Sequence, residues 1–258
     1  MLNQMIPLPG RKGAWLDAYL QTNCTELEME RWKTRPAMLV IPGGAYQFLA
    51  EREGEPLALR YAAAGFQTFV LHYSLNTGLQ EPLLDAAAAM LLIRAHAQEW
   101  QIAPEQVAVI GSSAGGNLAL WLSAFTRPGE TALNAWTPCP EACRPNAQVL
   151  CYPAVMGAGC DPAFVASLPE PSLYERLAGM PPTFLWTTQD DHIVPAAETL
   201  LLGQKMNEAQ VPLEMYIFQT GDHGLATADE ATGRVAAHVA GWLPQSVDWL
   251  YALFGRKG

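Results

Sequence analysis

Short apolar segments alternate along the chain with longer segments that have helical periodicity. Six runs of five or six residues are almost continuously apolar, as expected for strands buried on both faces of a parallel sheet. These strand candidates are Ala37–Ile41, Thr68–Tyr73, Val107–Gly111, Gln148–Tyr152, Thr183–Thr187 and Leu213–Phe218. The helix candidates are Glu55–Ala64, Leu84–Trp100, Ala114–Phe125, Ala196–Ala209 and Thr227–Leu243. Strand followed by helix, repeated, predicts an α/β fold with a mostly parallel central sheet and helices on both faces.

The two ends of the chain depart from this alternation. Trp15–Leu20 and Leu27–Trp32 favour two antiparallel edge strands. Val247–Phe254 is apolar and predicts a helix packed on the domain, with a homodimer contact as the alternative. A chain of 258 residues lies within the range of a single α/β domain, so one domain is expected over residues 1–258.

A proline-rich region at about residues 127–182 also breaks the pattern. Ten of the 20 prolines fall between Pro128 and Pro182. Proline fixes φ and removes a backbone donor, so this region is predicted to be mostly loop around the strand Gln148–Tyr152. Such loops often carry substrate contacts in α/β enzymes. An ordinary long connection is the alternative, and the sequence favours neither.

Composition and charge exclude several classes of protein. Half of the residues are hydrophobic and 16% are charged, which excludes a disordered chain. The net charge is −10 without any basic run, which argues against nucleic acid and an anionic membrane surface as partners. The start of the chain does not have the pattern of a secretory signal, and five cysteines, an odd number, are typical of reduced thiols. We therefore expect a cytoplasmic protein without a metal or cofactor.

The segment Gly111-Ser112-Ser113-Ala114-Gly115 places a serine where a predicted strand meets a predicted helix. Small residues on both sides allow the sharp turn that holds such a serine with its hydroxyl above the sheet. The following helix directs its N-terminal amides to the same point. This G-x-S-x-G pattern predicts Ser113 as a nucleophile and the Ala114 N–H as an oxyanion donor. A glycine-rich turn with an idle serine is the alternative.

A second glycine turn, Pro42-Gly43-Gly44-Ala45-Tyr46, follows the strand Ala37–Ile41. In a fold with such a serine turn, the loop after this strand supplies further oxyanion donors. The N–H groups of Gly44 and Ala45 are the candidates. Tyr46 is a candidate for stacking on the substrate, and core packing is its alternative role.

The nucleophile needs a base, and five histidines compete for that role. His223 lies in a glycine-flanked loop after the strand Leu213–Phe218, from which a side chain can reach over the end of the sheet. His192 is the second candidate. The remaining histidines lie within predicted helices or strands, where packing or surface roles are expected: His72, His96 and His238.

Two aspartates compete to orient the base. Asp190 and Asp191 follow the strand Thr183–Thr187, at the end where open α/β sheets place functional groups. The spacing to the next helix favours Asp191, and Asp190 is expected in a solvated turn. The order Ser113, Asp191, His223 is the one found in α/β-hydrolases.

The chain resembles α/β-hydrolases of the esterase and lipase group, close to acetyl-xylan and feruloyl (sugar) esterase-like proteins. The resemblance covers about four fifths of the chain and rests on the segments PGGAY, GSSAGGNLA, DHIVP and HG. Four positions depart from the family pattern. Ala45 replaces a glycine, His72 and Ser74 replace asparagine and arginine, and Thr188 replaces a smaller residue.

The resemblance implies a serine hydrolase that cleaves short-acyl esters through an acyl-enzyme, with a small-molecule ester as substrate. Acetyl esters of small or carbohydrate alcohols are the expected substrates. Two alternatives stay open. One is a serine peptidase of the same fold, which normally carries a large additional domain, and the other is a hydrolase-like binding protein without activity.

Overall fold

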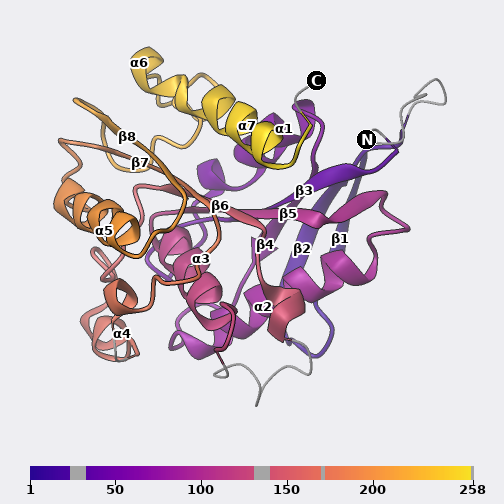
Figure 1. Ribbon diagram of the computed structural model, residues 1–258, viewed down its shortest axis with the longest axis horizontal. Helices are drawn as coiled ribbons and strands as arrows, with labels where there is room; N and C mark the ends of the chain where they lie inside the picture. Colours follow the sequence, from indigo (N-terminus) through magenta and orange to yellow (C-terminus); the bar gives the residue numbers. More distant parts are fainter. Residues whose placement is uncertain (24–32, 131–139, 170–171, 257–258) are drawn as a thin grey trace.

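The computed structural model describes residues 1–23, 33–130, 140–169 and 172–256, and it places eight strands in one sheet in the order β1-β2-β4-β3-β5-β6-β7-β8 (Figure 1). The pairs β1·β2 and β2·β4 are antiparallel, and the other pairs are parallel. The strands are β1 (Leu2–Pro7), β2 (Trp15–Leu20), β3 (Arg35–Ile41), β4 (Gln67–His72), β5 (Ile102–Ser112), β6 (Ala147–Cys151), β7 (Thr183–Thr188) and β8 (Leu213–Phe218).

Helices cover both faces of this sheet. They are α1 (Glu55–Ala63), α2 (Gln80–Ala95), α3 (Ala114–Phe125), α4 (Pro162–Ala166), α5 (Ala196–Glu208), α6 (Ala237–Ala240) and α7 (Trp242–Leu253). In Figure 1, α1, α6 and α7 lie above the sheet, whereas α2, α3 and α5 lie below it. The predicted α/β fold with a mostly parallel sheet is confirmed.

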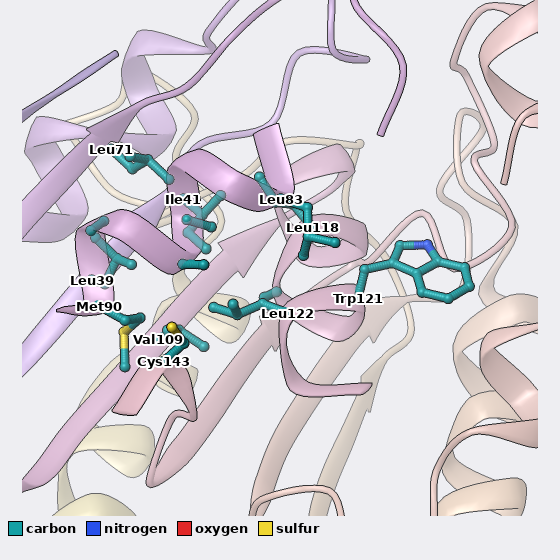
Figure 2. Close-up of a cluster of buried hydrophobic side chains, with 14 of the residues drawn as sticks. Leu39, Ile41, Leu71, Leu83, Met90, Val109, Leu118, Trp121, Leu122 and Cys143 are labelled. Carbon is teal, nitrogen blue, oxygen red and sulfur yellow. The ribbon is translucent and has the colours of Figure 1, made fainter. Parts of the chain in front are cut away.

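Two hydrophobic clusters hold these layers together. Alternate side chains of β3 enter opposite clusters, because successive residues of a strand point to opposite faces. Leu39 and Ile41 pack with residues of α2 and α3 (Figure 2), and Met38 and Val40 pack with residues of α1 and α7. All four side chains are fully buried. Both faces of the central strands are therefore inside the protein, which explains their nearly continuous apolar sequences.

The prediction of one continuous helix over Thr227–Leu243 is wrong. Residues 227–236 form turns and irregular segments, and the helices that follow are α6 and α7. A carboxylate oxygen of Asp229 accepts the Thr227 hydroxyl at 2.6 Å and the Ala231 N–H at 3.0 Å. Such local side-chain hydrogen bonds offer the backbone an alternative to a helix.

The edges of the sheet differ partly from the expectation. Trp15–Leu20 is an edge-region strand as predicted, but its antiparallel outer partner is β1. The predicted strand Leu27–Trp32 lies wholly outside the described residues. The C-terminal apolar segment lies largely within α7, whose buried residues face the sheet. Within the described residues, every helix is too short or too polar to span a lipid bilayer.

Candidate active site

Ser113 occupies a sharp turn between the end of β5 and the start of α3. Its φ of 53° and ψ of −120° are strained for a residue with a side chain, as expected for a nucleophile in such a turn. The turn is anchored to the segment after β6, because Ser113 N donates to Cys151 O and Ala154 N donates to Ser113 O, each at 3.0 Å. A Cβ at Gly115 would lie 2.6 Å from Pro42 O, so only glycine lets this turn approach the loop predicted to carry the oxyanion donors.

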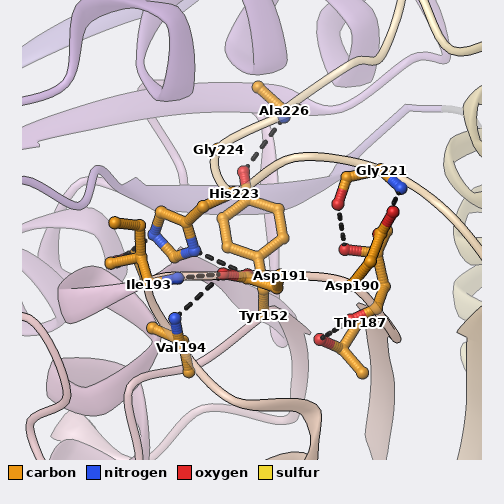
Figure 3. A network of polar contacts seen from close by, with 12 residues as sticks. Tyr152, Thr187, Asp190, Asp191, Ile193, Val194, Gly221, His223, Gly224 and Ala226 are labelled. Atoms are coloured by element: carbon orange, nitrogen blue, oxygen red, sulfur yellow. Dashed lines mark hydrogen bonds and ion pairs between the residues drawn. The ribbon is translucent and has the colours of Figure 1, made fainter.

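The three residues predicted as a catalytic triad meet at this turn. His223 Nε2 lies 2.8 Å from Ser113 Oγ, and its Nδ1 lies 2.7 Å from Asp191 Oδ2. The other carboxylate oxygen of Asp191 accepts the N–H groups of Ile193 and Val194 at 2.8 and 2.9 Å (Figure 3). The Asp191 side chain is fully buried. A buried, fixed carboxylate on Nδ1 leaves Nε2 as the nitrogen that can take the serine proton.

Asp190 has a different contact from its neighbour. Its Oδ1 accepts the N–H of Gly221 at 2.6 Å, two residues before His223. Thr188, a departure from the family pattern, donates its hydroxyl to Gly221 O at 2.6 Å. Both groups therefore hold the start of the histidine loop (residues 219–226), where Figure 3 shows Asp190 beside Gly221.

The oxyanion loop, residues 42–48, is oriented by hydrogen bonds to its carbonyl groups. Gly43 O accepts Ala50 N at 3.0 Å, and Gly44 O accepts Gln47 N at 2.9 Å. In a trans peptide the C=O and N–H groups point in opposite directions, so the N–H groups of Gly44 and Ala45 point away from these donors. In the described part of the chain, neither N–H has an acceptor. The Ala114 N–H is at the first position of α3, where intrahelical acceptors are absent.

A cavity of about 220 Å³ lies in front of the serine and histidine. Its wall includes the predicted oxyanion donors Gly44 and Ala45, the exposed apolar side chains of Phe48 and Ile193, and residues 158–159 of the proline-rich region. Ala45 also lines a second cavity of about 390 Å³, between the oxyanion loop, residues 76–78 and α4. The proline-rich region thus contributes to the walls of both cavities.

Tyr46 is placed to support the oxyanion loop, and its ring is not free to stack on a ligand. Tyr46 is 2% exposed, and its ring stacks on Phe164 at a centroid distance of 4.2 Å. Its hydroxyl donates to Asn117 Oδ1 at 2.8 Å, which ties the loop to α3. Burial raises the pKa of this hydroxyl well above its usual value, so it remains a donor. Tyr46 is also one of the residues that line the second cavity.

Sequence reasoning missed two buried polar side chains beside the triad. Glu53 accepts the Gly43 N–H, and Tyr152 packs edge-on against the His223 ring at a centroid distance of 5.0 Å. Glu53 lies in a strongly charged stretch that reads as a solvated turn, and Tyr152 stands at the end of an apolar strand. Neither position carries a local signal for its role.

The other histidines lie apart from this site. His72 pairs with Asp17 and stacks on Trp15, and His96 pairs with Glu99 and stacks on Trp100. His238 bonds to Thr220, and His192 is exposed. In the described ranges, no group of three or more histidine, cysteine, aspartate or glutamate side chains is arranged to hold a metal ion. The geometry at Ser113 is that of a serine hydroxyl, a histidine nitrogen on it and a carboxylate on the histidine.

Comparison with protein families agrees with this geometry. A family model described as the alpha/beta hydrolase fold matches residues 40–167, a range that includes Ser113 and the oxyanion loop. A second model, described as the prolyl oligopeptidase family, matches residues 151–248, a range that includes Asp191 and His223.

Known relatives extend the similarity over most of the chain. An acetylxylan esterase of Xylanibacter ruminicola is 26% identical over 208 residues, covering 73% of this chain and 40% of that protein. An α/β-hydrolase enzyme from a Medee basin deep-sea metagenome library is 32% identical with a TM-score of 0.82, covering 99% of this chain and 98% of its own. An acetyl ester-xyloside bifunctional hydrolase of Caldicellulosiruptor lactoaceticus is 30% identical with a TM-score of 0.80, covering 99% and 97%. The chain spans 33–40% of the length of the curated relatives it matches.

Proposed function

The chain belongs to the α/β-hydrolase family, in its esterase group, and from this premise we propose that it is a serine carboxylic-ester hydrolase for short-acyl esters. The observation that carries the proposal is the hydrogen-bonded series Ser113–His223–Asp191 at a cavity lined by Gly44 and Ala45, whose N–H groups have no acceptor among the described residues. Acyl transfer requires this combination of nucleophile, base and oxyanion donors.

The mechanism follows from the positions of these atoms. His223 Nε2 takes the proton of Ser113 Oγ as that oxygen attacks the ester carbonyl carbon. The tetrahedral intermediate collapses when the bond to the alcohol oxygen breaks and His223 returns the proton to that oxygen. The acyl group is then an ester of Ser113. A water molecule, deprotonated by His223, then attacks the acyl carbon. The bond from that carbon to Ser113 Oγ breaks and His223 returns the proton to Oγ, which releases the acid and restores the serine.

Backbone donors stabilise the negative charge that develops on the carbonyl oxygen. The N–H groups of Gly44, Ala45 and Ala114 are the proposed donors. Loss of one such donor in a serine hydrolase typically costs about 2.7–4 kcal/mol of transition-state stabilisation. Asp191 contributes on the other side of the ring, because it fixes the histidine tautomer and stabilises the imidazolium that forms.

The sizes and linings of the two cavities favour an acetyl ester of a small or carbohydrate alcohol. The cavity at Ser113, about 220 Å³, is small and partly apolar, as suits a short acyl group. The cavity on the other side of Ala45 is larger, and its polar side chains include Gln47, Asn76 and Asp161. Such side chains can hydrogen-bond to the hydroxyls of a sugar. The relatives described as acetylxylan esterase and acetyl ester-xyloside hydrolase support the same class of substrate.

A matched panel of esters tests this function. Wild-type protein and the Ser113→Ala variant would be assayed with p-nitrophenyl acetate, an acetylated xylo-oligosaccharide and methyl ferulate. We expect serine-dependent turnover of the acetylated sugar above that of the activated acetate, with a loss on the order of 10⁶ in kcat for Ser113→Ala. Turnover of the nitrophenyl ester alone would support serine-dependent ester hydrolysis and contradict a carbohydrate ester as the substrate. Absence of any serine-dependent turnover, together with absence of fluorophosphonate labelling, would favour a binding protein.

A serine peptidase is the second candidate, because the prolyl oligopeptidase model matches the segment that contains the acid and the base. That match does not reach Ser113 or the oxyanion loop. An aminoacyl p-nitroanilide added to the panel decides between the two. Serine-dependent cleavage of the anilide at a rate comparable to that of the acetyl ester would favour the peptidase.

A further inference from the structure

Glu53 is a buried carboxyl that the mechanism above does not use. It lies in the short 3₁₀ turn Glu51–Glu53, between the oxyanion loop and α1, and is 1% exposed. Burial raises its pKa, while the nearby Arg52 and the hydrogen bonds to its oxygens act in the opposite direction. A buried carboxyl is costly unless both oxygens are satisfied, so its partners are informative.

The first oxygen of Glu53 fixes a peptide of the oxyanion loop. Glu53 Oε2 accepts the Gly43 N–H at 2.9 Å, and the hydroxyl of Tyr73 donates to Pro42 O at 2.8 Å. These two groups belong to one peptide unit, which is therefore held at both ends by buried side chains. A Cβ at Gly43 would lie 2.6 Å from Glu53 Oε2, so this approach requires glycine. The next two peptides carry the Gly44 and Ala45 N–H groups.

The second oxygen of Glu53 reaches the histidine loop. Glu53 Oε1 accepts the Tyr152 hydroxyl at 3.0 Å, and the same hydroxyl accepts the Ala226 N–H at 3.0 Å. Ala226 stands three residues after His223, whose ring packs against Tyr152 (Figure 3). The adjacent Arg52 donates Nε to Gly224 O at 2.7 Å. The turn thus contacts the oxyanion loop on one side and the histidine loop on the other.

We propose that Glu53 is a positioning residue, which joins the oxyanion loop and the histidine loop through Gly43 and through the Tyr152 hydroxyl. It keeps the N–H groups of the oxyanion loop and the His223 ring in fixed positions relative to Ser113. The interaction is made by both carboxylate oxygens at once, so it couples two loops that are far apart in the sequence. The inference rests on the proposed esterase activity.

The isosteric and truncating variants have different expected effects. Glu53→Ala releases Gly43 N–H and Tyr152 together, and we expect a fall in kcat on the order of 10²–10³ with little change in KM, as for loss of an oxyanion donor. Glu53→Gln keeps an acceptor for one partner only, so its loss should be smaller. Tyr152→Phe breaks the link to Ala226 and leaves Gly43 bound. Its effect should be largely absent in the Glu53→Ala background, because the two residues act as a unit.

The test is steady-state kinetics with p-nitrophenyl acetate, combined with the affinity for phenylboronic acid. The boronate adds to Ser113 Oγ and places an oxygen in the oxyanion site, so its inhibition constant should rise in parallel with the fall in kcat/KM. Fluorophosphonate labelling gives the fraction of active sites, and thermal unfolding reports the fold. The control is Glu55→Gln, the same change at an exposed carboxylate two residues away, which should match the wild type.

Three results would overturn the inference. One is a Glu53→Ala variant with nearly normal kcat, and another is a loss of kcat without loss of boronate affinity. The third is a Glu53→Ala variant that does not fold, while Glu53→Gln and Tyr152→Phe keep normal kinetics and normal boronate affinity. An inactive wild type would overturn the esterase proposal, whereas an active wild type with unaffected variants overturns this inference alone.

Discussion

The adjacent residues Asp190 and Asp191 illustrate how one position in the chain decides a chemical role. The Asp191 carboxylate is buried, accepts two backbone N–H groups and faces His223 Nδ1. Asp190 is exposed and accepts the N–H of Gly221 at the start of the histidine loop. A carboxylate can stabilise an imidazolium only where it contacts the ring, so Asp191 is the residue placed to do so.

Substituting each aspartate with asparagine separates the two roles. Asp191→Asn should lower kcat by about 10⁴, because an amide favours the wrong histidine tautomer. Asp190→Asn keeps an oxygen that can accept the Gly221 N–H, so its kcat should change by less than about tenfold. Both variants would be compared with p-nitrophenyl acetate. A large loss for Asp190→Asn with a nearly active Asp191→Asn would contradict the assignment.

At the scale of elements, the sequence predicts what local patterns determine and misses what distant contacts determine. The central strands and the elbow at Ser113 carry their own signals, namely continuous apolar runs and a G-x-S-x-G turn. β1 was not predicted because it is an exposed edge strand with no fully buried residue. Glu53 is buried by the loops that follow β3, β6 and β8. These loops are far apart in the sequence, so no short segment predicts that they come together around Glu53.

The contact between α7 and the histidine loop gives a prediction at this scale. Trp242 is fully buried and donates its indole Nε1 to Ala226 O at 3.0 Å. Trp242→Phe leaves this carbonyl without its donor, which should cost about 1–3 kcal/mol of unfolding free energy and lower the Tm. Because Tyr152 still holds Ala226 N, kcat should remain near normal.

Trp249→Phe is the matched control for that helix. Trp249 lies on α7, is only partly buried and packs against Phe184. Its substitution should lower the Tm less than that of Trp242. A Trp242→Phe variant with an unchanged Tm, or with a kcat as low as that of Tyr152→Phe, would contradict the prediction that Trp242 supports stability and Tyr152 supports activity.

At the scale of the molecule, the parallel strands explain how residues far apart in the sequence form one site. The oxyanion loop follows β3, Ser113 follows β5, Asp191 follows β7 and His223 follows β8. Parallel strands bring their carboxyl ends to one edge of the sheet, where open α/β sheets place their functional groups. The region between β6 and β7 adds walls at this edge, with residues 158–159 at the cavity in front of Ser113.

These walls limit the length of the acyl group. A cavity of about 220 Å³ next to Ser113 can enclose a short acyl chain, and a longer chain would leave its methylene groups in water. A methylene that stays in water gains none of the roughly 0.8 kcal/mol that burial would give, and a chain that overfills the cavity displaces the ester carbon from Ser113 Oγ. We therefore expect kcat/KM to fall from p-nitrophenyl acetate to butyrate to decanoate, after subtraction of the Ser113→Ala background.

A variant of the wall tests whether the cavity itself sets this preference. Ala158 lines the cavity and is partly exposed, so leucine at this position should narrow the space without disturbing the core. Ala158→Leu should lower kcat/KM for the butyrate more than for the acetate, since only the longer chain reaches the added atoms. Faster turnover of decanoate than of acetate by the wild type would show that the acyl group does not bind in this cavity. An equal loss for acetate and butyrate in Ala158→Leu would place the acyl group elsewhere along the same edge of the sheet.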